Sequence, residues 1–164
     1  MAGYPFSGKS HIAELLVKLR PDIGIINPKL LRPAEYEKMS EDDKRDCNLA
    51  AWEVSLEELE EAIVTKSDKI TIYDTCCASF YKMEPYFVLA KQQKHKIIYV
   101  FVDSSLELCE KRAGNSWLPK DVIVKYDVNF GVSIEGLAKL ADHTVVVKNQ
   151  EGEPDVTKIM RLLE

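Results

Sequence analysis

The stretch Gly3-Tyr4-Pro5-Phe6-Ser7-Gly8-Lys9-Ser10 matches the phosphate-loop pattern G-x-x-x-x-G-K-[ST] at every fixed position. The two glycines let the backbone wrap closely around a phosphate chain, so that several N–H groups converge on an anion. In this pattern the lysine reaches the β- and γ-phosphates, and the hydroxyl of the last residue ligates Mg²⁺. The pattern therefore predicts that the phosphates of a nucleotide are bound by Gly3, Tyr4, Pro5, Phe6, Ser7, Gly8, Lys9, Ser10 and His11.

The residues after the loop predict a helix. Apolar side chains recur at Ile12, Leu15, Leu16 and Leu19, which is helical spacing. A helix in this place turns its positive N-terminal end toward the bound phosphates. This context favours nucleotide binding over a Gly-Lys-Ser turn that matches the pattern by accident.

Fewer residues precede the loop than the strand that normally leads into this pattern would need. Only Met1 and Ala2 precede Gly3, where a buried strand of several apolar residues is expected. Such a strand is central in its sheet, so its loss leaves unpaired backbone on both neighbours. We expect a truncated first strand because the numbered chain starts late. The alternatives are that two residues do the work of the strand, or that the sequence is a piece of a larger protein.

Composition places the chain among ordinary globular proteins. With 164 residues, 46% hydrophobic and 30% charged, it suits a single domain over residues 1–164. No apolar run reaches membrane-spanning length and no signal peptide is present, so we expect a cytoplasmic protein. The net charge of −5 argues against a surface that wraps duplex DNA, though not against a small basic cleft for a strand end. The four cysteines lack metal-ligand spacing, which favours free thiols: Cys47, Cys76, Cys77 and Cys109.

Strand and helix patterns alternate along the rest of the chain. Apolar runs predict strands over residues 23–27, 69–74, 96–103 and 142–147. Amphipathic patterns predict helices over residues 40–66, 79–95, 104–112, 120–127, 133–140 and 155–163. Ser40 is expected to cap the first of these helices, and Ser104 or Ser105 the third. The alternation predicts an α/β fold, a doubly wound parallel sheet with helices on both faces.

Asp74 is the second chemical anchor, because it closes an apolar strand near the phosphate loop. A carboxylate in this position can hold Mg²⁺ or receive a proton from a hydroxyl acceptor, although it can also simply cap the next segment. Thr75 stands where motor ATPases place a glutamate, and no N-K-x-D motif occurs. These absences argue against a hydrolase and a GTPase switch, and leave a transferase.

Phosphoryl transfer also needs cations around the migrating group. Arg112 ends the helix after the strongest strand, and Arg32 follows the first strand, so both are candidates as well as possible surface arginines. Trp117 lies in the loop after Arg112 and either closes over a base or anchors that loop. The predicted catalytic residues are Lys9, Asp74, Arg112 and Arg32, and the predicted metal ligands are Ser10 and Asp74.

The phosphate loop, the strand ending Ile-Tyr-Asp74-Thr-Cys and the segment Tyr-Val-Phe-Val-Asp-Ser-Ser-Leu-Glu-Leu-Cys-Glu-Lys-Arg112 resemble the polynucleotide-kinase-like group of P-loop kinases. The resemblance covers nearly the whole chain, but only the phosphate loop is a specific motif. It implies that the loop binds ATP–Mg²⁺, that Arg112 stabilises the transferring phosphate, and that Arg32 matches an arginine after the second strand. Acceptors in the group range from DNA or RNA ends and modified bases to nucleosides and small metabolites.

One departure from this group bears on the acceptor. Polynucleotide kinases place an aspartate base after the second strand, whereas this loop reads Asn27-Pro28-Lys29-Leu30-Leu31-Arg32. Either Asp74 is the base, or the acceptor loses its proton late in a loose transition state. We expect an ATP-dependent kinase that phosphorylates a hydroxyl of a nucleic acid or nucleotide-like acceptor. A kinase of a nucleoside or small metabolite, and a nucleotide-binding module without turnover, are the alternatives.

Overall fold

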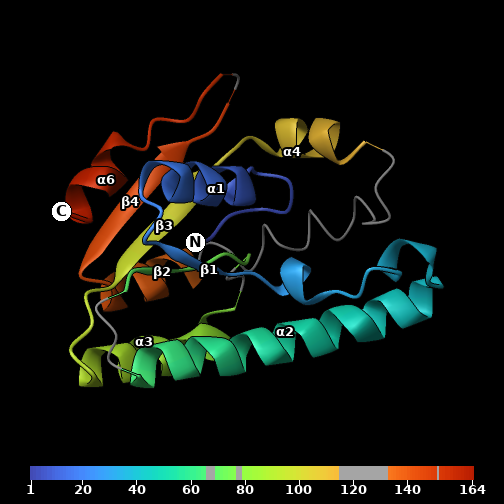
Figure 1. The fold of residues 1–164 in the computed structure, drawn as a ribbon. Coiled ribbons are helices and arrows are strands. Elements are labelled where there is room, and N and C mark those ends of the chain that lie inside the picture. The colour runs from blue at the N-terminus through green and yellow to red at the C-terminus, as the bar shows by residue number, and fades with distance from the viewer. Residues whose placement is uncertain (66–68, 77–78, 115–132, 151) are drawn as a thin grey trace.

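The computed structural model describes residues 1–65, 69–76, 79–114, 133–150 and 152–164 (Figure 1). The elements in chain order are α1 (Lys9–Leu19), β1 (Gly24–Ile26), η1 (Pro28–Leu31), η2 (Tyr36–Lys38), α2 (Glu41–Val64), β2 (Thr71–Tyr73), α3 (Phe80–Gln92), β3 (Ile98–Asp103), α4 (Leu106–Ala113), β4 (His143–Lys148) and α6 (Thr157–Leu162). A further helix covers residues 133–140. The helix predicted over 120–127, together with Trp117 and Cys77, falls outside the described residues.

The four strands in the described part of the chain pair in parallel. β1 pairs with β2, with Ile25 beside Ile72, and β3 pairs with β4, with Val100 beside Val145. Between these two pairs lies the amino end of the chain. Ala2 donates its N–H to the Val100 carbonyl at 2.8 Å and accepts from the N–H of Val102 at 2.8 Å. Met1 and Ala2 thus lie between the two pairs of strands.

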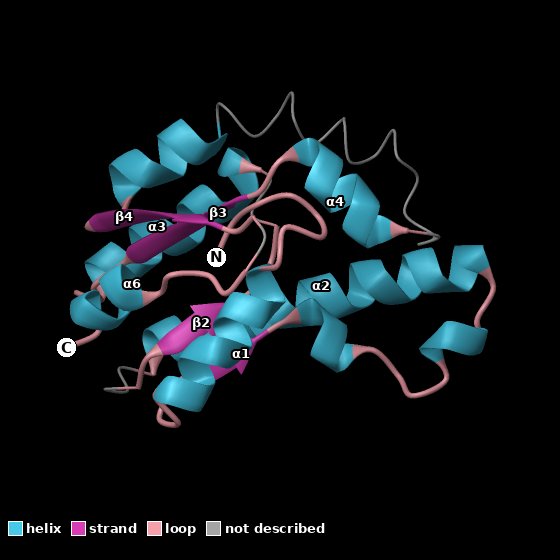
Figure 2. Cartoon of the chain, turned by 90° about the horizontal axis from the view of Figure 1, so that it is seen from above, coloured by secondary structure: helices cyan, strands magenta, loops and turns pink. Residues whose placement is uncertain are grey.

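Helices cover both faces of the strands, as the alternating pattern predicts (Figure 2). On one face α1 and α6 pack onto β3 and β4 in a core formed by Ile12, Leu16, Ile23, Val100, Val102, Val145, Val147, Val156 and Ile159. On the other face the core consists of Ala2, Tyr73, Met83, Tyr99 and Leu137. In Figure 1, α2 and α3 run together along one side of the strands. The doubly wound α/β fold is confirmed.

Local signals set several element boundaries. The Ser40 hydroxyl accepts a hydrogen bond from the Asp43 N–H at 3.2 Å and so caps α2. Ser105 caps α4 in the same way, through the Leu108 N–H. The strands β1 and β2 are shorter than the apolar runs that predicted them, because pairing extends over only three residues on each strand. Among the described residues, no helix is both long and apolar enough to span a membrane.

Candidate active site

The phosphate loop adopts backbone angles that only glycine tolerates at its two fixed positions. Gly3 has φ +146° and Gly8 has φ +92°. A Cβ on Gly8 would lie 2.1 Å from Nδ2 of Asn149, and a Cβ on Gly3 would lie 2.7 Å from the Val102 carbonyl oxygen. The loop therefore packs tightly against the strand ends, and both glycines are required by space as well as by conformation.

The Lys9 side chain folds back over this loop. Its ammonium group donates to the carbonyl of Gly3 at 3.1 Å and to the carbonyl of Tyr4 at 2.6 Å. Lys9 is only 8% exposed, although it opens α1. A buried positive charge is thus held over the backbone amides that would surround a phosphate chain.

The Ser7 carbonyl fixes the middle of the loop to three other parts of the chain. It accepts from Nδ2 of Asn149 at 2.7 Å and from Nη1 of Arg112 at 3.3 Å. The Ser104 hydroxyl, which has one proton to donate, lies 2.9 Å from this carbonyl and 2.6 Å from that of Asn149. Ser104 follows β3 and Asn149 follows β4. Residues at the ends of both strands therefore hold the loop by hydrogen bonds to the Ser7 carbonyl.

Sequence reasoning missed two of these residues. Ser104 was considered only as a helix cap, a role that Ser105 fills, and Asn149 was not singled out. The available signal was a polar residue directly after each buried parallel strand, because ligands and loops meet at that edge of the sheet.

Replacing Asn149 with alanine is expected to lower the free energy of unfolding by about 1 kcal/mol, because it removes one of the hydrogen bonds to the buried Ser7 carbonyl. Asn149 is buried, whereas the neighbouring Gln150 is exposed and contributes only its carbonyl, to Nη2 of Arg112. Gln150→Ala is therefore the matched control. Urea unfolding of both variants measures the difference, and equal midpoints would show that the Asn149 amide does not hold the loop.

A carboxylate lies at the end of β2, beside an amide at the end of β1. Asp74 is 3% exposed, and its Oδ2 accepts from Nδ2 of Asn27 at 2.6 Å. The Asn27 Oδ1 accepts from the Lys29 N–H at 2.8 Å, which fixes the orientation of the amide. The other Asp74 oxygen, Oδ1, is buried with no hydrogen-bond partner among the described residues. Sequence reasoning placed Asn27 only in the loop after the first strand, because its contact with Asp74 depends on the parallel pairing of β1 and β2.

The segment after Asp74 runs beside the phosphate loop. The Gly3 N–H donates to the Cys76 carbonyl at 3.4 Å, and the Met1 ammonium group donates to the Tyr73 carbonyl at 2.5 Å. These contacts join the end of β2 to the start of the loop. The carboxylate and the loop therefore belong to one edge of the sheet.

The two predicted arginines lie in different places. Arg112 contacts the loop, since Nη1 also lies 3.5 Å from the Phe6 carbonyl. Arg32 instead stacks over the ring of Tyr36, with its guanidinium carbon 4.5 Å from the ring centre. In the described part of the chain, no hydrogen bond joins Arg32 to the loop or to Asp74, and its Nε is buried without a partner. The structure thus brings together Lys9, Arg112 and the loop, and leaves Arg32 beside η2.

The residues at this edge fit a nucleotide with Mg²⁺. A buried carboxylate oxygen without a donor, as on Asp74, is a suitable ligand for a hard cation. Ser10, the second residue of α1, supplies the hydroxyl of the motif, and His11 beside it is exposed. The described residues contain no group of three or more His, Cys, Asp or Glu side chains placed to hold a metal. This agrees with Mg²⁺ coordination that relies largely on phosphate oxygens and water.

The thiol of Cys109 is unsuited to act as a nucleophile. Burial raises the pKa of Cys109, although the positive charges of Lys9 and Arg112 oppose the shift. Below its raised pKa, the thiol remains protonated, and the reactive species is the thiolate.

Two solved structures share this fold. A chain from the PezAT chromosomal toxin–antitoxin system of Streptococcus pneumoniae aligns with a TM-score of 0.63 and 16% identity, covering 92% of this chain and 66% of the other. A gluconokinase from Sinorhizobium meliloti 1021 aligns with a TM-score of 0.53 and 17% identity, covering 99% of this chain and 86% of the other. At these identities the likeness shows the fold alone.

Comparison at the level of sequence gives the family. No curated protein matches the chain. The family model described as AAA domain matches residues 1–115, which include the phosphate loop, Asn27, Asp74 and Arg112. Because this match covers more than half of the sequence, the chain belongs to the AAA domain family.

Proposed function

We propose that this protein, acting as a single domain over residues 1–164, is an ATP-dependent kinase of the polynucleotide-kinase-like group. It transfers the γ-phosphate to a hydroxyl of a nucleic acid or nucleotide-like acceptor. The observation that carries the proposal is the placement of the buried Lys9 ammonium and the buried Asp74 carboxylate at one edge of the sheet. The first group suits phosphate, and the second suits a cation or a proton.

The loop and Lys9 bind the nucleotide in this proposal. Lys9 exchanges its hydrogen bonds to the Gly3 and Tyr4 carbonyls for hydrogen bonds to phosphate oxygens of the nucleotide. The backbone amides of the loop bind the other phosphate oxygens. Ser10 and Asp74 would hold Mg²⁺, which when bound neutralises charge on the β- and γ-phosphates. Arg112, fixed at the Ser7 carbonyl, places a guanidinium group next to the loop to balance charge that develops during transfer.

Asp74 is also the candidate base. Its Oδ2 is held by Asn27, so Oδ1 is the oxygen available to accept a proton from the acceptor hydroxyl. The loop after β1 offers Asn27 and the exposed Lys29 where a carboxylate would otherwise stand. A loose transition state lowers the demand for a strong base, so a single carboxylate can serve both the cation and the proton.

A second candidate acceptor is a small metabolite or a nucleoside. The first turn of α2 carries Glu41, Asp42 and Asp43, all exposed, and α2 packs against η1 and η2 near the end of β1. This acidic surface repels a polyanion more than a small neutral acceptor. The gluconokinase with the same fold is named for a small-molecule acceptor.

The test is transfer of labelled γ-phosphate from ATP to a panel of acceptors: 5′-hydroxyl DNA and RNA, hydroxymethyl-base DNA, tRNA, nucleosides and small sugar acids. We expect ADP release that depends on one class of acceptor and on Mg²⁺. For a polymer acceptor, log affinity should also fall linearly with log salt concentration. ATP binding with no acceptor-dependent ADP release for any class would overturn the kinase and leave a binding module without turnover.

A further inference from the structure

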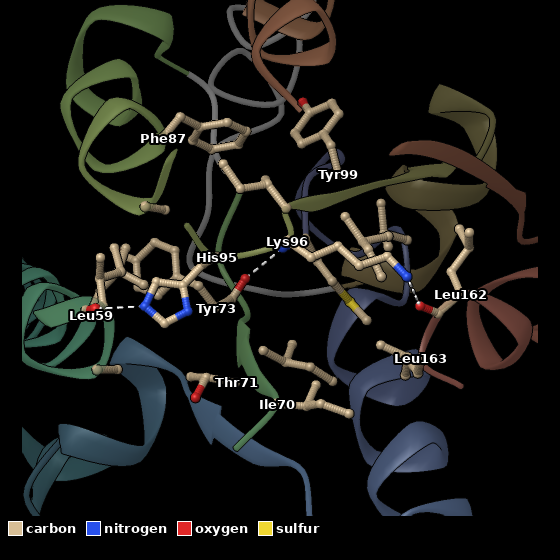
Figure 3. A pocket seen from close by; sticks show the side chains of 18 of the residues that line it. Leu59, Ile70, Thr71, Tyr73, Phe87, His95, Lys96, Tyr99, Leu162 and Leu163 are labelled. Atoms are coloured by element: carbon tan, nitrogen blue, oxygen red, sulfur yellow. Dashed lines mark hydrogen bonds between the residues drawn. The ribbon is translucent and has the colours of Figure 1, made fainter. Parts of the chain in front are cut away.

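The helix α3 carries apolar side chains on two opposite faces. Its inner face packs on the strands through Met83, Phe87 and Ala90, and Figure 3 shows the Phe87 ring turned toward Tyr99 of β3, with the ring centres 6.1 Å apart. Its outer face consists of four exposed residues: Tyr81, Pro85, Val88 and Gln92. Three of these four are apolar. A helix needs only one apolar face to cover a sheet, so the outer face requires a separate explanation.

The spacing of these four residues, which we call the outer seam of α3, is that of a coiled coil. Steps of four, three and four residues separate Tyr81, Pro85, Val88 and Gln92. This alternation lets two helices lie side by side, with the side chains of one inserted between those of the other. Tyr81 is 82% exposed and Val88 is 40% exposed, so both are available for such packing. The spacing therefore indicates a second helix on this face.

A groove runs beside the outer seam, between α3 and α2. It has a volume of about 500 Å³, and its lining includes Pro85, Val88, Leu89 and Gln92 of α3 and Glu60 of α2. The two helices pack against each other and run together along one side of the molecule (Figure 1). A helix that lies on the outer seam would place side chains of its own flank in this groove.

The charges beside the outer seam favour an antiparallel copy of the same helix. Glu84 precedes Pro85 and Lys91 precedes Gln92, so both charges lie on one flank of the seam. In the described part of the chain, neither takes part in an ion pair. When two copies of a helix run antiparallel about a two-fold axis, each flank meets the same flank of the other copy. Glu84 of one copy then faces Lys91 of the other, and this pair occurs twice.

We propose that the outer seam of α3 is an interface at which two copies of this protein form a dimer with two-fold symmetry. At its centre, Pro85 packs against the partner's Val88. At each end, Tyr81 packs against the partner's Gln92, whose amide provides a hydrogen-bond partner for the phenol hydroxyl. The interface lies on α3, and the phosphate loop is not part of it.

A second copy fits this surface better than a strongly charged partner. Glu84 and Lys91 lie on one flank of the outer seam, and the groove on the other flank is lined by Glu60 and Lys82. Each flank therefore carries one charge of each sign. A strongly basic or strongly acidic helix would meet a like charge on either flank, whereas a copy of α3 brings the opposite charge to each.

Sedimentation of the full chain, without ATP or acceptor, tests this interface independently of the proposed kinase activity. We expect monomers to give way to dimers as the concentration rises from about 1 to about 100 µM, because a small helix-pair interface is of the weak class. Val88→Glu places two carboxylates at the centre and should lower the association constant by about tenfold or more. Val88 lies outside the core, so the thermal midpoint of the variant should remain that of the original chain.

The matched control is Leu49→Glu, which makes a similar change on α2. Leu49 is 55% exposed and lies in the first half of α2, which extends past α3 in Figure 1. This variant should dimerise as the original chain does. Equal association of the Val88→Glu and Leu49→Glu variants would overturn the proposal, because any dimers would then use another face.

Exchanging charges tests the antiparallel arrangement. Glu84→Lys and Lys91→Glu each place like charges opposite one another, and each should weaken the dimer by about threefold or more. The double variant with both substitutions restores opposite charges at both pairs and should recover most of the affinity. The proposal is also overturned if the chain remains monomeric up to about 100 µM, or if the double variant associates no better than the single ones.

Discussion

Lys9→Met is expected to lower the rate of phosphate transfer on the order of 100-fold or more, because it deletes the buried cation that lies against the phosphate loop. The Lys9 ammonium group lies against the carbonyls of Gly3 and Tyr4 and can move to phosphate oxygens without leaving the loop. Methionine keeps an unbranched side chain of comparable length and loses only the charge and its donors. Transfer of labelled phosphate at saturating acceptor, with ATP affinity from calorimetry, measures the loss.

The control for this variant lies on the same helix. Lys18 is exposed in the last turn of α1, so Lys18→Met makes the same chemical change away from the loop. It should leave transfer unchanged. If the two variants transfer phosphate at the same rate, the ammonium group of Lys9 takes no part in the reaction.

Asp74→Asn is expected to reduce Mg²⁺-dependent transfer by a similar factor while leaving the protein as stable as before or more stable. The carboxylate is buried and receives one hydrogen bond, from Asn27, and its Oδ1 has no partner among the described residues. A buried charge with few partners costs free energy, and the isosteric amide removes that cost. Activity and stability should therefore move in different directions, which a purely structural residue would not produce.

Urea unfolding and transfer rates at several Mg²⁺ concentrations separate the two effects. A loss that added Mg²⁺ partly restores identifies Asp74 as a cation ligand, and a loss that Mg²⁺ leaves unchanged identifies it as the base. Asn27→Ala is the companion variant, because it frees Oδ2 while leaving the carboxylate in place. A fall in stability for Asp74→Asn together with full activity would show that the carboxylate only supports the fold.

The features that the sequence could predict are those set by neighbouring residues. The phosphate loop, the Ser40 cap and the continuous apolar run of β3 each depend on a few consecutive positions, and each appears in the structure. The alternation of strands and helices along the sequence was then enough to predict the α/β fold class. The ends of β1 and β2 could not be read in the same way, because they depend on where pairing between strands stops.

The parts of the site that escaped prediction are contacts between distant positions. The bond from Asn149 to Ser7 spans 142 residues, and that from Asn27 to Asp74 spans 47. Neither asparagine lies in a recognisable motif, so only the packed sheet reveals their roles. Arg32 shows the reverse case, because its position after a strand suggested a place at the phosphates and the structure puts it over Tyr36.

The three donors to the Ser7 carbonyl have a consequence for how this protein can diversify. All three come from the β3–α4–β4 half of the chain, whereas η1 and η2 pack against α2. Substitutions between residues 28 and 48 therefore leave the hydrogen bonds to the Ser7 carbonyl in place. The hydrogen bonds that hold the loop and the segment between residues 28 and 48 lie in different parts of the fold, so a change in one part need not disturb the other.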